Sequence, residues 1–195
     1  NYLCELDGDL GDGDHGITME IGWKAALALV EQTDHTATIS ELCEGIGQAF
    51  LDAVGASVGP LYASGFNAAG EAVGDRLNLD ARAMIAWLDG MAQGITARGG
   101  AAVGDKTMVD AWEPAIAAAT IRFEQGASVG DCLMAGAQGA STGANATTQI
   151  SVTLFSSSTL DCCFSKSILF LITIISLSLG SSFFNLFSKL KLLSV

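Results

Sequence analysis

An all-α fold is predicted for residues 1–146 by three features of their sequence. Alanine and leucine, which favour helices, dominate this segment, and 29 of its residues are alanine. No stretch alternates between apolar and polar residues with the period of two that marks a half-buried strand. Glycines recur at intervals that suit turns between helices. The whole chain has 195 residues and a mass of 20.0 kDa, which fits one domain better than two.

The first predicted element is a short helical stretch that ends near Leu6. A loop rich in glycine and aspartate follows over residues 7–16, because both residue types favour turns. A helix is then predicted from about Ile17 to Gln32, since apolar side chains recur along one helical stripe: Ile17, Ile21, Ala25, Ala28 and Leu29.

Two helices with clear start signals are expected next. Thr38 with Glu41 three residues later forms a capping-box pattern, which predicts a helix that ends near Val54. Residues 55–60 form a second glycine-rich loop. Pro60, at the end of this loop, suits the first turn of a helix that continues to about Val73.

The last three predicted helices follow the same logic. Asp80 can cap a helix that ends near Arg98, and a third glycine-rich loop covers residues 99–107. The next helix runs from about Thr107 to Phe123, and Pro114 is expected to kink it or to lie near its start. Ser128 can cap a final helix toward Ala146. Glycine-rich loops therefore precede three of the helices.

Composition changes abruptly near Thr147. Residues 1–146 carry 20 acidic and 6 basic residues, a net charge of −14, whereas residues 147–195 contain no alanine and 12 serines. We therefore divide the chain into a helical domain, 1–146, and an unrelated hydrophobic tail rich in Ser, Leu and Phe, 147–195, which we expect to lie outside the functional fold. The net charge of −12 argues against a nucleic-acid partner, which requires clustered Lys and Arg.

The cysteines give no sign of a disulfide framework or a zinc site. The chain has five cysteines, an odd number, and neither a Cys-x-x-Cys pair nor a histidine cluster. Cys4, Cys43 and Cys132 are expected to be small buried residues of a protein in a reducing compartment. With no visible signal peptide, a cytoplasmic location is predicted.

Residues 7–16 place four carboxylates, those of Asp7, Asp9, Asp12 and Asp14, within eight residues and directly before a helix. A solvated turn is the simplest interpretation, but so dense a cluster of like charges favours a hard cation such as Mg²⁺ or Ca²⁺. An EF-hand is excluded because glycines occupy ligand positions of its loop. A dinucleotide fingerprint is excluded because no strand precedes the glycines.

A magnesium-nucleotide site remains. Asp7, Asp12 and Asp14 cannot share one helix face, but a loop tightened by glycines could bring them together. The helix that follows His15 would direct its free N–H groups at a phosphate that shares the metal.

Three sequence blocks in this order resemble the L subunit of dihydroxyacetone (glycerone) kinase, also found as the nucleotide-binding, DhaL-type domain of single-chain enzymes. They are Leu6-Asp7 with Gly11-Asp12-Gly13-Asp14-His15-Gly16, then Gly55 to Leu61, then Gly99-Gly100 with Gly104-Asp105-Lys106-Thr107-Met108, which Asp110-Ala111 continues. The related fatty-acid kinases usually have Asp-Thr-Gly where this chain has Asp14-His15-Gly16, so His15 favours the dihydroxyacetone kinase branch.

The resemblance implies an antiparallel helical barrel, with eight helices in the intact family and about six in this chain. It also implies two Mg²⁺ ions and ADP or ATP as the bound groups, and it assigns no catalytic side chain to this domain. The implied metal ligands are Asp7, Asp12 and Asp14. The implied nucleotide-binding positions are His15, Gly16, Ile17 and Thr18 at the phosphate-contacting helix start, Ser57, Val58 and Gly59 in a second phosphate loop, and Gly99, Thr107 and Met108, with Met108 against the adenine.

In the family, the phosphoryl acceptor is dihydroxyacetone or a similar small ketose bound covalently to a separate K subunit or domain. The resemblance therefore implies a kinase subunit of glycerol metabolism with a K-type partner, and a phosphocarrier protein is an alternative to ATP as the phosphoryl donor. No nucleic-acid partner and no membrane partner are expected. The alternative function is a truncated, inactive relative that binds metal or nucleotide without turnover.

Several residues also have simpler interpretations. Met108 suits an ordinary core position as well as an adenine contact, and Lys106 suits either a phosphate contact or the start of a helix. The tryptophans Trp23, Trp87 and Trp112 are expected in the core. Asp9 and His35 are expected to be exposed to solvent.

The sequence departs from the family after Ala140. Its Gly-Arg-Ala-Ser-Tyr and Asp-Pro-Gly motifs, which close over the nucleotide, are not found. For the tail, an apolar membrane anchor over Ser167 to Phe187 competes with translation past a frameshift or misplaced exon boundary. The abrupt change of composition favours the second interpretation.

Overall fold

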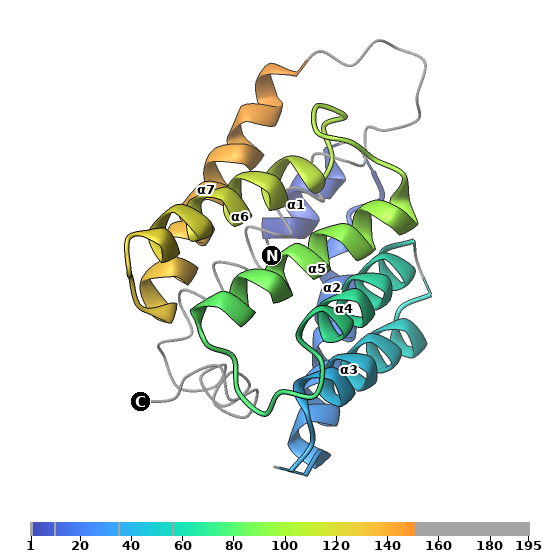
Figure 1. Cartoon of the computed structure of the whole chain (residues 1–195). Helices are drawn as coiled ribbons and strands as arrows, with labels where there is room; N and C mark the ends of the chain where they lie inside the picture. The colour runs from blue at the N-terminus through green and yellow to red at the C-terminus, as the bar shows by residue number, and fades with distance from the viewer. Residues whose placement is uncertain (1, 10, 35, 56, 151–195) are drawn as a thin grey trace.

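The computed structural model describes residues 2–9, 11–34, 36–55 and 57–150 (Figure 1). This part of the chain contains α-helices and one short 3₁₀ helix but no strand, so the predicted all-α fold is confirmed. The elements are α1 (Tyr2–Gly8), α2 (His15–Gln32), α3 (Ile39–Ala53), α4 (Val58–Val73), α5 (Ala81–Gly99), α6 (Val109–Glu124), α7 (Val129–Ala146) and η1 (Thr147–Gln149).

Each helix packs against the next one along the chain, and consecutive helices run in opposite directions (Figure 1). This is the neighbour order that an antiparallel helical barrel requires. The six helices from α2 to α7 have 15 to 19 residues each, in agreement with the expected number of long helices. The alternation also places the N-termini of α2, α4 and α6 at the same end of the molecule, together with the C-termini of α3 and α5.

The three predicted helix caps are present. Thr38 and Glu41 form a reciprocal capping box, in which the Thr38 N–H donates to the Glu41 carboxylate at 2.8 Å. The Asp80 carboxylate accepts a hydrogen bond from Ala83 N at 2.8 Å, at the start of α5. The Ser128 hydroxyl accepts one from Asp131 N at 3.2 Å, at the start of α7. Local hydrogen bonding therefore fixes these three starts as the sequence predicts.

The predicted boundaries are wrong at three loops. Helix α4 begins at Val58, so residues 58–60 form its first turn rather than the end of the predicted loop 55–60. Helix α1 continues through Asp7 to Gly8, and α2 begins at His15 rather than Ile17, because the Asp14 carbonyl accepts the first helical hydrogen bond, from Thr18 N. Helix α6 begins at Val109 rather than Thr107, because the Thr107 hydroxyl accepts a hydrogen bond from Val109 N and so lies ahead of the helix. Asp7 is consequently held by the last turn of a helix rather than by a loop.

Aromatic residues fill the centre of the α2–α4 layer. Phe50 and Tyr62 are fully buried and stack with ring centroids 5.1 Å apart, and the partly buried Trp23 meets both rings edge-on. Trp87 and Trp112 are also buried, which confirms their predicted core positions, whereas Trp23 packs against the core while only partly buried. Large buried aromatic surfaces contribute strongly to stability and hold these helices in fixed positions.

The cysteine prediction is correct at two of its three positions. Cys43 and Cys132 are buried, and Trp87 Nε1 donates to Cys43 Sγ at 3.2 Å. Burial raises the pKa of the Cys43 thiol to about 11, which makes this thiol unreactive near neutral pH. Cys4 is only half-buried, because α1 directs Leu3 and Asp7 inward and Cys4 flanks that stripe.

Two other predictions concern residues beyond this description. His35 and the tail from residue 151 on, with the proposed anchor at Ser167 to Phe187, lie outside the described residues. Within the described ranges, no helix has the length and apolar character needed to cross a bilayer.

Candidate metal and nucleotide site

Asp7 anchors the loop between α1 and α2. Its side chain is only 3% exposed, and its Oδ2 accepts a hydrogen bond from His15 N at 3.2 Å. The Asp7 carbonyl also accepts one from Gly11 N. These two bonds fold the loop back, so that the end of α1 lies beside the first residue of α2.

The same fold-back brings three of the four loop carboxylates together. Asp7, Asp12 and Asp14 each offer one oxygen atom, and these atoms all lie within 4.8 Å of one another. Asp7 is buried, whereas Asp12 and Asp14 are exposed, so a cation held here keeps positions open for water or phosphate. Asp9 is exposed and lies outside this aspartate cluster, as predicted. Oxygen ligands in this arrangement suit Mg²⁺.

Repulsion within the aspartate cluster raises the pKa of one of its carboxyl groups. The pKa of Asp14 is raised, mainly by the neighbouring negative charge of Asp12, with smaller contributions from desolvation and from Asp7. Burial lowers the pKa of His15, which favours a neutral imidazole beside the carboxylates. Because the imidazole is then uncharged, it does not offset the negative charge, and a bound divalent cation would relieve this repulsion directly.

Two glycines permit the loop to adopt this shape. Gly13 has φ of +75°, a left-handed conformation that residues with a Cβ rarely adopt. Gly11 lies so close to Asp7 that an added Cβ would stand 2.5 Å from Asp7 Oδ1. The glycine spacing of the loop is therefore required by the geometry of the carboxylates.

Replacing Gly11 with alanine is expected to weaken divalent-cation binding about tenfold, because the new methyl group must displace the Asp7 carboxylate. Mn²⁺ titration followed by electron paramagnetic resonance measures this affinity. Gly8→Ala is the matched control, since the nearest atom to its added Cβ, Gly13 Cα, lies at 3.9 Å. Equal Mn²⁺ affinities in Gly11→Ala and the wild type would contradict the assignment of Asp7 as a ligand.

The first turn of α2 begins at the aspartate cluster. His15 is buried, Gly16 and Thr18 are half-buried, and the Ile17 side chain is 52% exposed. Asp14 occupies the N-cap position without a side-chain capping bond, so its carboxylate does not saturate the amides of this turn. The His15 N–H donates to Asp7, so this helix N-terminus would attract anions through its dipole and through the N–H groups that follow His15.

The second predicted loop leads into α4. Ser57 occupies the N-cap position, and its exposed side chain makes no capping hydrogen bond. Val58 directs its side chain into the core, where it is 1% exposed. Gly59 packs against the Val54 carbonyl oxygen so tightly that no side chain would fit. This segment can therefore offer a ligand the Ser57 hydroxyl and backbone groups.

The third predicted loop connects α5 to α6. Gly99 is the exposed last residue of α5, Thr107 is half-buried and Met108, the N-cap of α6, is buried within the core. Lys106 lies in the loop, three residues ahead of α6, so the interpretation as a helix start is wrong. Its Nζ donates to the Ile150 carbonyl at 3.4 Å.

Sequence reasoning missed the role of Asp110. This residue is 7% exposed, and its carboxylate accepts hydrogen bonds from Gly104 N at 2.6 Å and Thr107 N at 2.8 Å. The available signal was an aspartate in the first turn of a helix that follows a glycine-rich loop.

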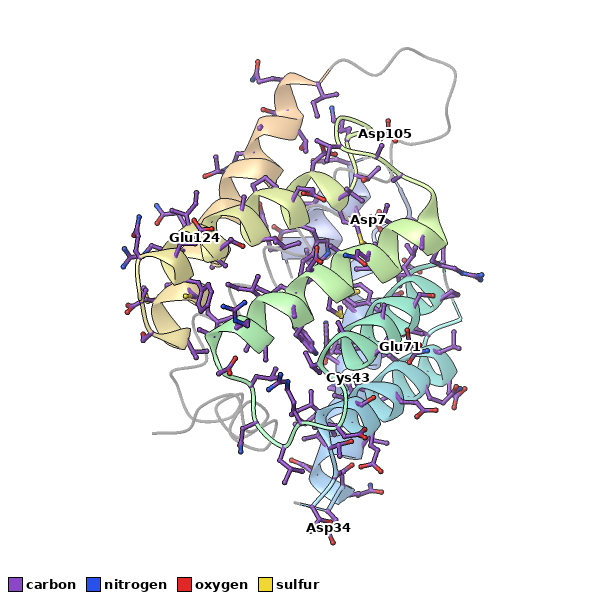
Figure 2. The ribbon with its side chains drawn as sticks, in the orientation of Figure 1. Asp7, Asp34, Cys43, Glu71, Asp105 and Glu124 are labelled. Carbon is purple, nitrogen blue, oxygen red and sulfur yellow. The ribbon has the colours of Figure 1, made fainter. Side chains whose placement is uncertain are left out.

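The three loops and the aspartate cluster occupy the same end of the fold, because α2, α4 and α6 all begin there. In Figure 2, Asp7 and Asp105 lie in the upper part of the molecule, whereas Asp34, after the end of α2, lies at the bottom. The N-termini of three helices therefore point toward the end that carries the aspartate cluster. Together they could hold a metal ion and an anionic ligand.

The chain is similar to known proteins over most of its length. The DAK2 domain family matches residues 9–162. The ADP-binding subunit DhaL of the PEP-dependent dihydroxyacetone kinase of Escherichia coli is 33% identical over 148 residues, which are 75% of this chain and 69% of that protein. A DhaL subunit of Listeria innocua, from its PEP-dependent dihydroxyacetone kinase 2, is 36% identical over 60% of this chain. The L-erythrulose kinase of Pectobacterium atrosepticum is 34% identical over 76% of this chain and 25% of its own length.

The fold is also similar to that of a solved structure. The dihydroxyacetone kinase of C. freundii in complex with AMP-PNP and Mg²⁺ matches with a TM-score of 0.65 and 25% identity, over 91% of this chain and 30% of that one. The chain spans about half the length of the first curated relatives, 54% to 57%. On the DAK2 match to most of its length, and on its identity to the Escherichia coli subunit, the chain belongs to the DAK2 domain family.

Proposed function

We propose that this chain is the magnesium-nucleotide-binding subunit or domain of a dihydroxyacetone-type kinase. The observation that carries the proposal is the convergence of Asp7, Asp12 and Asp14 within 4.8 Å at the N-terminus of α2. Curated relatives named as ADP-binding subunits, and a related structure that holds AMP-PNP and Mg²⁺, support it.

In this proposal the aspartate cluster holds two Mg²⁺ ions that also contact the nucleotide phosphates. In the first turn of α2, residues 15–18, the N–H groups of Gly16 and Ile17 would donate to those phosphates, whereas His15 and Thr18 would contribute their side chains, since their N–H groups already donate to Asp7 and to the Asp14 carbonyl. The segment 57–59 at the start of α4 would donate further hydrogen bonds. Gly99 and Thr107 would contact the nucleoside of ADP or ATP, and Met108, which is buried within the core, would support the adenine from below. Mg²⁺ supplies charge neutralisation during phosphoryl transfer, and the chain supplies positioning.

The acceptor in the proposed reaction is dihydroxyacetone or a similar small hydroxy ketone, held by a separate K subunit or domain. Relatives named for L-erythrulose and dihydroxyacetone, both small hydroxy ketones, support this class of substrate. Other relatives are named PEP-dependent or PTS-dependent, so a phosphocarrier protein is proposed beside ATP as a donor.

The domain division also remains a proposal. We infer that residues 1–146 form the functional domain and that 147–195 form a separate tail. Thr147 itself is fully buried, and its hydroxyl donates to the Ala144 carbonyl at 2.7 Å, so η1 packs on the end of α7. This packing, and the extension of the DAK2 match to residue 162, count against a boundary at residue 146 and favour a later one. A cytoplasmic location likewise remains a prediction.

Calorimetric titration of the full chain with ADP tests the function. Binding is expected in Mg²⁺ and should weaken at least tenfold, by order of magnitude, after chelation with EDTA, because the metal links carboxylates to phosphates. AMP, with one phosphate, is the control and should bind more weakly than ADP. A folded chain that releases no heat with ADP and Mg²⁺ would support the inactive alternative instead.

A further inference from the structure

One buried carboxylate holds the loop between α5 and α6. Asp110 lies in the first turn of α6 and is 7% exposed. Its Oδ1 accepts a hydrogen bond from Gly104 N at 2.6 Å, and its Oδ2 accepts one from Thr107 N at 2.8 Å. Both carboxylate oxygens are thus committed to backbone amides of the same loop. Charge-assisted hydrogen bonds of this kind are stronger than those between neutral groups.

These two bonds enclose a residue with an unusual backbone conformation. Lys106 has φ of +62° and is the one residue other than glycine with positive φ among those the structure describes. Gly104, on one side, has φ of +95°, and Thr107 lies on the other. Conformations this unfavourable persist where surrounding contacts impose them, and they occur often at ligand-binding loops. The two Asp110 bonds supply part of that constraint. Two bonds between Asp105 and Ala102, and the bond from Lys106 Nζ to the Ile150 carbonyl, supply the rest.

The conformation of residues 104–107 determines where the backbone of the third glycine-rich loop, residues 99–107, can contact a ligand. Thr107 and Met108 follow Lys106 directly, and the Thr107 amide is one of the two groups that Asp110 fixes. If the two bonds broke, Gly104 and Thr107 would no longer be tied to the start of α6, and we expect the backbone between them to become less ordered. A loop fixed in advance binds its ligand more tightly, because binding then does not need to order it.

We infer that Asp110 is a positioning residue for the nucleotide: it sets the 104–107 loop in the conformation that receives the nucleoside. This inference rests on the proposed function. It assigns Asp110 no contact with the nucleotide or with the metal; the residue acts through the backbone of Gly104 and Thr107.

An ordinary helix-capping role is the competing explanation, and α7 provides a matched control. Asp131 also lies in the first turn of its helix, where its carboxylate accepts a hydrogen bond from the Ser128 hydroxyl at 2.8 Å. That contact spans three residues, whereas Asp110 reaches back six residues to Gly104. Because α7 begins at the opposite end of the fold from α6, Asp131→Asn removes a capping charge far from the proposed site.

The test compares wild type, Asp110→Asn and Asp131→Asn, each as the full chain. ADP affinity in Mg²⁺ is expected to fall about tenfold in Asp110→Asn and to stay unchanged in Asp131→Asn. Mn²⁺ affinity without nucleotide should be equal in all three, because the aspartate cluster is untouched. Hydrogen exchange of the wild type should show protected amides at Gly104 and Thr107, a readout that does not depend on any variant's folding.

The outcomes separate the inference from the function on which it rests. Equal ADP affinity in Asp110→Asn and the wild type would overturn the positioning role alone. A parallel loss of Mn²⁺ and ADP affinity would also overturn it, since that pattern marks general damage. Amides at Gly104 and Thr107 that exchange like those of an unfolded peptide would do the same. A wild type that binds Mn²⁺ but no ADP would remove the proposed function and this inference together.

Discussion

Replacing Asp12 with alanine is expected to weaken magnesium-dependent ADP binding by about 100-fold or more, because it removes one of three carboxylates that converge on the metal. The variant should fold normally. Asp12 is exposed, and its charge is the main cause of the raised pKa of Asp14, so its removal relieves repulsion in the metal-free chain. Isothermal titration with ADP in Mg²⁺ measures the loss.

Asp9→Ala is the matched control for this experiment. Asp9 carries the same charge in the same loop, but it is exposed and lies outside the aspartate cluster. Its removal should change ADP affinity only about fivefold or less, since an exposed carboxylate that contacts no metal acts through water, whose high dielectric constant weakens the interaction to about 1 kcal/mol. If Asp9→Ala and Asp12→Ala lose affinity equally, the effect is one of general charge, and the metal assignment of Asp12 is wrong.

Gly143→Ala is expected to cost about 3 kcal/mol of unfolding free energy, although alanine is the better helix former. An added Cβ would overlap the Asp110 carbonyl oxygen and stand 2.8 Å from Pro114 Cγ and 3.2 Å from Ala111 Cα. The overlapping atom belongs to the backbone, so no side-chain rotation relieves it. Pro114 has no N–H to donate to the Asp110 carbonyl, which leaves this oxygen facing α7. Chemical denaturation gives the free energy.

Gly130→Ala, in the same helix, is the control for overpacking. The nearest atom to its added Cβ, Ser128 Oγ, lies at 3.8 Å, an ordinary contact distance. This variant should be neutral or more stable by about 0.5 kcal/mol, since alanine restricts the unfolded chain. Equal stabilities for the two variants would show that α6 and α7 do not approach as closely as described. Gly143→Ala should also lower ADP affinity, because it pushes the backbone that carries the Asp110 carboxylate.

Helix starts were predictable wherever a short sequence pattern carries its own hydrogen bonds. Thr38, Asp80 and Ser128 each cap a helix through a bond to an amide three residues later, so each signal lies within four residues. The α1–α2 loop was predicted too long because its limits depend on contacts between elements. Asp7 ends up buried in a helical turn because its carboxylate bonds to His15, eight residues away.

The candidate site also has features that the sequence predicts and features that only the folded chain shows. The meeting of Asp7, Asp12 and Asp14 followed from their spacing and from the glycines between them, which leave few other arrangements for so many like charges. The role of Asp110 had a local signal, its place in the first turn of a helix after a glycine-rich loop, although its bond to Gly104 spans six residues. The positive φ of Lys106 had no such signal, since it arises when the chain folds back over the start of α6. No local propensity favours lysine in that conformation.

A crystal structure of the full chain with Mn²⁺ and ADP tests the central claim most directly. Anomalous scattering from manganese identifies the metal position independently of the protein atoms. We predict a manganese peak about 2 Å from oxygens of Asp7, Asp12 and Asp14 and from a phosphate oxygen of ADP, at the N-terminus of α2. Manganese and ADP bound elsewhere, with these three carboxylates contacting solvent alone, would contradict the account.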